Sequence, residues 1–232
     1  MWLTILMLVI FAACVGTLWA EGMWGNAVRL VNVVTAALLA TNYFEPVADW
    51  LQSNATSYTY VCDFLALWGL FVIFMVIFRI LTDRLSKVKV RFLKIADTAG
   101  SVFFSIWVGW MMVCFTMFSL HVAPLDRICL GDSFKPENTV LMFAPDRQWA
   151  AFVQKVSRGP FSRSASSQEL AKRAYGVPPA DDESEAKSCV FDRNGEFLMM
   201  YATRRARLGS YHDSNKGSIR VPQAKMASQY DQ

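Results

Sequence analysis

The chain has 232 residues, of which 54% are hydrophobic and 18% are charged, and its formal net charge is +4. This small and dispersed positive charge does not favour a nucleic-acid partner. The two histidines, without a Cys-x-x-Cys pair, do not favour a zinc or haem site. Apolar residues are concentrated before residue 120, which predicts a membrane part followed by an extramembrane part of similar length.

The first apolar segment covers residues 2–20 and contains no charged side chain. It lacks the positive n-region of a signal peptide, and Leu18 and Trp19 do not fit a cleavage site before Ala20. We therefore expect an uncleaved transmembrane helix. Ala12, Gly16 and Ala20 lie four residues apart, so they should form one small face against which a neighbouring helix packs closely.

A turn at residues 21–26 should relax the backbone between the first two spans, because it contains Gly22 and Gly25. The second span is expected at residues 27–43. Arg29 and Asn32 share a face of this span with two small alanines, and such a face should pack against other helices rather than lipid. Two interpretations of Arg29 remain open, namely snorkelling to the headgroups and an ion pair inside the bundle with Glu21.

Two further spans are expected at residues 61–81 and 98–120, the second without any charged residue. The connector at residues 79–94, which overlaps the end of the third span, is strongly basic, and its attraction to anionic headgroups is the simplest interpretation. Its basic residues are Arg79, Arg84, Lys87, Lys89, Arg91 and Lys94. In the fourth span, Ser101, Ser105 and Gly109 are four apart and predict a helix-packing face.

The rest of the chain predicts a small α/β extramembrane region at residues 121–208. It should contain a strand and helix (139–158), a disordered linker (157–187) and a β-hairpin (188–203), followed by a disordered tail (209–232). The helix is indicated by Trp149, Phe152 and Val153 at helical spacing, and the hairpin by Asn194-Gly195 between two β-like runs. The fold class is thus an all-α polytopic membrane protein with four transmembrane helices and an α/β C-terminal region.

No motif of a known catalytic, cofactor-binding or metal-binding type is present, so we expect no enzyme and no cofactor. Cys14, Cys62 and Cys114 fall in or beside apolar spans, where a thiol packs as a small hydrophobe. Cys129 and Cys189 are the two cysteines outside the spans. They form a disulfide if that region faces an oxidising compartment, or else they are two unrelated thiols.

Two short stretches resemble the colicin V production (CvpA) family. The first is EGMWGNAVRL at residues 21–30, which is similar to the family's glycine-rich turn and the arginine that enters its second helix. The second is IADTAG at residues 95–100, which resembles the family's Asp-x-x-Gly entry to the fourth helix. The chain departs from the family in having Thr4 and its neighbours where an early acidic residue is usual, and in its long C-terminal extension.

The resemblance implies an inner-membrane protein linked to bacteriocin production or export and to envelope stress resistance. Its partners would be the lipid bilayer and either further copies or other membrane proteins. We expect a small oligomeric transporter or assembly factor; the alternative is a non-catalytic anchor that presents a periplasmic C-terminal interaction domain. The candidate functional positions are Glu21, Gly22, Gly25, Arg29, Asn32, Asp97, Gly100 and Gly109.

Charge distribution predicts the topology. The connector between the last two spans carries six basic residues and the loop at residues 44–60 carries none, so the connector should be cytoplasmic. Four spans then place both termini and the 44–60 loop outside. A fusion of alkaline phosphatase after Leu120 should be active. Activity there of a reporter that works only in the cytoplasm would contradict this topology.

Overall fold

The computed structural model describes residues 2–54, 59–85, 94–125, 144–157, 191–192 and 197–203. Within these residues the structure is helical and contains no strand. The labelled helices are α1 (Trp2–Leu18), α2 (Met23–Asn54), α3 (Thr59–Leu85), α4 (Lys94–Val122) and α5 (Pro145–Ser157). The predicted strand at 139–143, linker at 157–187 and tail at 209–232 lie wholly or almost wholly outside the described residues.

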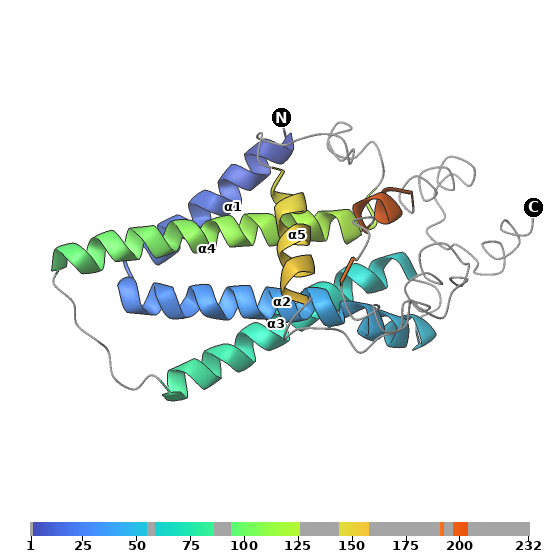
Figure 1. Ribbon diagram of the computed structural model, residues 1–232, viewed down its shortest axis with the longest axis horizontal. Coiled ribbons are helices and arrows are strands. Elements are labelled where there is room, and N and C mark those ends of the chain that lie inside the picture. The colour runs from blue at the N-terminus through green and yellow to red at the C-terminus, as the bar shows by residue number, and fades with distance from the viewer. Residues whose placement is uncertain are drawn as a thin grey trace, which may run out of the picture.

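The four long helices lie in the spatial order α1, α4, α2, α3 (Figure 1). α4 packs against α1 on one side and α2 on the other, and α3 packs along α2. α5 crosses α4 and α2 near the end of the bundle where α4 finishes (Figure 1). α4 is therefore the helix to which most of the structure is attached.

Three helices are long and apolar enough to cross a membrane: residues 23–52 of α2, residues 61–85 of α3, and α4. α3 exposes aliphatic side chains along much of its length, including Leu65, Val72 and Ile80, and these would be covered by lipid in a bilayer. α1 is apolar but shorter, and its 17 residues rise roughly 26 Å.

α2 is longer than the span expected at residues 27–43, and most of the expected 44–60 loop is helical. Pro46 lies inside α2, where it cannot donate a backbone hydrogen bond. The helix continues through it because Phe44 and Ala48 are fully buried in the main core. Tertiary packing thus overrides the local signal that a proline and a polar stretch give.

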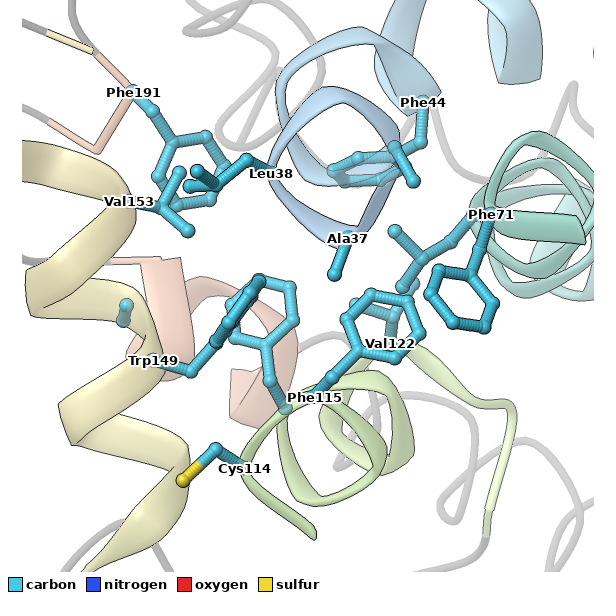
Figure 2. Close-up of a cluster of buried hydrophobic side chains, with 14 of the residues drawn as sticks. Ala37, Leu38, Phe44, Phe71, Cys114, Phe115, Val122, Trp149, Val153 and Phe191 are labelled. Atoms are coloured by element: carbon cyan, nitrogen blue, oxygen red, sulfur yellow. The ribbon is translucent and has the colours of Figure 1, made fainter. Parts of the chain in front are cut away.

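The main core combines small residues on α2 with aromatic rings from other helices (Figure 2). Ala36, Ala37 and Ala40 are almost completely buried, which lets α3 and α4 approach α2 closely. Phe115 of α4 contacts the ring of Trp149 of α5 at a centroid distance of 5.8 Å. The amphipathic α5 is thereby held on the bundle by its apolar face, as its sequence pattern predicts.

The face of small residues expected on α1 does not pack against another helix among the described residues. Ala12, Gly16 and Ala20 are exposed, and a Cβ added at Gly16 would meet nothing within 4 Å. α1 instead buries Leu3 and Met7 against α4. The small residue that permits close approach is on the other helix: a Cβ at Gly109 would lie 3.1 Å from Phe11 Cδ2.

The predicted β-hairpin at 188–203 is wrong for its second half, because residues 197–203 are helical. Phe197 and Tyr201 are four residues apart, so a helix places both rings on one side, where their centroids are 4.7 Å apart. The intervening Leu198, Met199 and Met200 have good helix propensity. A strand would have placed Phe197 and Tyr201 on one face as well, so alternation alone did not distinguish the two structures.

Substitution of Gly109 by Leu should weaken the packing of α1 on α4. The added side chain meets Phe11 and Val15 in a packed contact, and overpacking of this kind costs about 1–3 kcal/mol. Gly69→Leu is the matched control, since a Cβ at Gly69 meets nothing within 4 Å. The free energy of unfolding in mixed micelles measures both, and equal values for the two variants would contradict the packing.

Candidate functional site

The turn between α1 and α2 is held by α4. Gly22 lies in this turn with φ +90°, a backbone conformation that side-chain-bearing residues rarely adopt. The carboxylate of Asp97 lies beside it, because a Cβ at Gly22 would be 3.5 Å from Asp97 Oδ2. A glycine at position 22 therefore allows the backbone conformation of the turn and leaves room for the Asp97 carboxylate of α4.

Asp97 caps α2 from another helix. The first backbone N–H groups of a helix have no partner within that helix, and an Asp, Asn, Ser or Thr just before the helix usually accepts from one of them. Gly22 has no side chain to do so, and Met23 N–H instead donates to Asp97 Oδ1 at 2.9 Å. A carboxylate at this position also interacts favourably with the positive end of the α2 dipole.

Asn26 is the centre of a buried polar cluster and is 0% exposed. Its Nδ2 lies 2.7 Å from the carbonyl oxygen of Leu18 and 2.9 Å from Ser101 Oγ. Ser105 Oγ and the carbonyl oxygen of Ser101 are both 3.3 Å away. One amide nitrogen thus links the C-terminal end of α1 to the N-terminal half of α4 and fixes the start of α2 between them.

The two serines of α4 are themselves hydrogen-bonded in this cluster. Ser101 Oγ donates to the carbonyl oxygen of Trp19 at 2.7 Å, and Ser105 Oγ donates to the carbonyl oxygen of Ser101. Asn26 Oδ1 is buried and accepts no hydrogen bond from the described residues. A buried acceptor without a donor is costly in an apolar environment, which marks Asn26 as the least satisfied group of the cluster.

Gly100 and Gly109 make room for this arrangement. A Cβ at Gly100 would lie 2.2 Å from Met23 Sδ and 2.4 Å from Met23 Cγ, so the start of α2 sits directly on the glycine. Gly109 serves the packing of α1, as described above. Gly25 differs, because it lies inside α2 and a Cβ there would meet nothing within 4 Å. No contact among the described residues accounts for a glycine at position 25.

Arg29 forms an ion pair with Glu21, the partner that the second interpretation of this arginine named. The two side chains are 25% and 42% exposed, which places the pair at the edge of the turn. Asn32 lies apart from this cluster, and its Nδ2 donates to Thr82 Oγ1 of α3 at 3.1 Å. The polar face of α2 thus contacts helices, as its sequence pattern predicts.

A second polar contact joins α4 to α5. His121 Nε2 lies 2.9 Å from Asp146 Oδ2, and both side chains are nearly buried. Burial alone would raise the pKa of the Asp146 carboxyl. The hydrogen bond and charge of His121, together with hydrogen bonds from the backbone N–H groups of Arg147 and Asp146, outweigh burial and hold this pKa below its ordinary value. The Trp149 indole also donates to Thr41 Oγ1, at 3.2 Å.

The structure therefore gathers Gly22, Asp97 and Gly100 at one place, with Glu21 and Arg29 at its edge. Sequence reasoning missed Asn26, which was the last residue of the expected glycine-containing turn and lies in the structure at the start of α2. An asparagine directly after the glycines that separate two apolar segments is the sequence signal that could have indicated it. Cys129 and Cys189 lie outside the described residues. Among the described residues, no group of three or more His, Cys, Asp or Glu side chains could hold a metal ion.

Long apolar helices with polar contacts between them define the class of α-helical membrane proteins. Residues 3–137 match the family model described as colicin V production protein. The match covers more than half of the chain and includes all the contacts described above between the α1–α2 turn, the start of α2 and α4. The chain therefore belongs to this family. The curated proteins and the solved structures gave no match. α5 and everything after it lie beyond the matched residues.

Replacement of Asp97 by Ala should remove the cap of α2 and reduce stability by about 0.5–2 kcal/mol. Thr98→Ala is the matched control, because the exposed Thr98 hydroxyl donates to the carbonyl oxygen of Lys94 within its own helix. Unfolding of both variants in mixed micelles, followed by circular dichroism, gives the comparison. A loss no larger than that of the control would show that Asp97 does not cap α2.

Proposed function

We propose that this protein is a four-span inner-membrane protein that acts in the production or export of a toxin and in envelope homeostasis. Membership of the colicin V production family supports this role. The fourth span would be α1, which carries no charged residue and packs along α4. Its roughly 26 Å is close to the thickness of the hydrocarbon core, and modest thinning of the bilayer accommodates the difference.

The observation that carries the proposal is the set of polar contacts within the matched helices. Buried polar groups in transmembrane helices are costly and usually functional. Asn26, Asn32 and Asp97 all contact another helix, and none of them faces the apolar exterior. We propose a small transporter or assembly factor built from several copies, in which these helix contacts hold the moving or assembling elements, and we propose no catalytic step.

The basic connector would be cytoplasmic, and the end of the bundle that carries α5 would be periplasmic. α1 and α4 run in opposite directions in Figure 1, as this topology requires. The second candidate function is an anchor that presents the C-terminal region to a partner. The exposed polar face of α5, with Arg147 and Lys155, favours this candidate.

Two variants distinguish these functions. Asn32→Leu removes the hydrogen bond to Thr82 while keeping the branched shape of the side chain, and Lys155→Glu reverses a charge on the exposed face of α5. A transporter or assembly factor should lose toxin export with Asn32→Leu and keep it with Lys155→Glu. Each variant is assayed for export in a producing strain, at equal amounts of inserted protein.

Val31→Leu is the control for Asn32→Leu, because the neighbouring Val31 is 64% exposed and contributes no polar group. Its export should equal that of the unmodified protein. The opposite pattern, with export kept in Asn32→Leu and lost in Lys155→Glu, would reject the proposal in favour of the anchor.

A further inference from the structure

The part of the chain beyond the family-matched residues returns to the bundle. We call Phe191, Asp192 and residues 197–203 the C-terminal strap. Phe191 is 0% exposed and Phe197 is 1% exposed, whereas Met199 on the other side of the strap is 63% exposed. The strap therefore buries one face in the bundle and turns the other away from it.

Aromatic rings make up the buried face. Phe197 stacks on Phe118 of α4 with a centroid distance of 4.9 Å and an interplanar angle of 15°. The Phe197 ring also lies nearly perpendicular to that of Phe44 of α2, at a centroid distance of 6.2 Å, and the centroids of Phe191 and Phe118 are 6.1 Å apart. Phe118 and Phe44 are both 0% exposed, and each has a strap ring among its contacts.

Hydrogen bonds hold the strap at the end of α5. Phe191 N–H donates to Ser157 Oγ at 3.0 Å, and Gln154 Nε2 donates to the carbonyl oxygen of Asp192 at 2.6 Å. Asp192 Oδ1 accepts from Phe197 N–H at 3.0 Å and so satisfies a backbone donor at the start of the short helix. α5 thus fixes the position from which the helical part of the strap reaches the bundle.

The strap also covers a buried carboxylate. Asp63 of α3 is 1% exposed. The Tyr201 hydroxyl donates to its Oδ2 at 3.2 Å, and Gln52 Nε2 of α2 donates to its Oδ1 at 2.8 Å. The oxygens of a carboxyl group buried near the end of an apolar helix need such donors, and the strap supplies one of them.

We propose that the C-terminal strap is a removable closure of this end of the bundle, whose release exposes Phe118 and Asp63. Residues 197–203 form a helix of about two turns, which is too short to be stable in water without its docking surface. Docking and helix formation therefore occur together, and the strap is either seated or released. Because the strap lies outside residues 3–137, this closure is a device that the extension adds to the family fold.

Cysteine accessibility tests the closure. The full-length protein, with its native cysteines replaced by Ala, carries a single Phe118→Cys substitution and is treated with a membrane-impermeant maleimide. Labelling should be slow, and a Phe191→Ala/Phe197→Ala double substitution should accelerate it at least about tenfold by releasing the strap. Met199→Ala is the control substitution in the strap, and it should leave the rate unchanged because Met199 is exposed.

Phe115→Cys is the control position. Phe115 is 0% exposed and lies about one turn before Phe118 on α4. Its ring contacts the rings of Trp68, Phe71 and Trp149 and no ring of the strap. It should stay protected in every variant. Equal labelling of Phe118→Cys with and without the strap rings would overturn the closure. So would a parallel rise at Phe115→Cys, because the strap would then stabilise the whole bundle rather than close one end.

Discussion

The structure depends on one constraint: polar groups at the ends of apolar helices must find their partners inside the protein. At the turn between α1 and α2, the carbonyl oxygen of Trp19 and the N–H of Met23 are hydrogen-bonded to α4. The carbonyl oxygen of Leu18 accepts from Glu21 N–H within the turn and also from Asn26. α4 supplies Ser101 and Asp97, and Asn26 bridges the turn to α4. The connection that joins the first two helices is therefore completed by a helix about 75 residues further along the chain.

Close packing makes these hydrogen bonds possible. Gly100 lets Met23 sit directly on α4, and Gly109 lets α1 lie against it. Gly100 and Gly109 are nine residues apart and therefore lie on opposite sides of α4, with the two serines between them, and apolar side chains fill the remaining space. A larger residue at position 100 would move the start of α2 away from Asp97, so packing and hydrogen bonding in this region depend on each other. The opposite end of the bundle uses bulky aromatic rings from α5 and the strap instead.

The sequence predicted the features that depend on local pattern. The long apolar runs predicted the membrane helices, and the helical spacing of Trp149 and Val153 predicted α5. The small residues four apart in α4 predicted its packing face. It did not predict features that depend on distant contacts. α2 continues past Pro46 because Phe44 and Ala48 are buried by other helices, and residues 197–203 are helical because two rings dock together. Asn26 was missed for the same reason, since its four oxygen neighbours come from α1 and α4.

A double-mutant cycle between Asn26 and Ser101 tests most directly whether α4 holds the turn between α1 and α2. The free energies of unfolding of Asn26→Ala, Ser101→Ala and the double variant are compared with that of the unmodified protein in mixed micelles. If the Asn26 amide and the Ser101 hydroxyl are bonded as described, the coupling energy should be about 1 kcal/mol, because the second substitution removes a contact already lost. Additive losses, with a coupling energy of zero within error, would contradict the proposition that α4 holds the turn between α1 and α2.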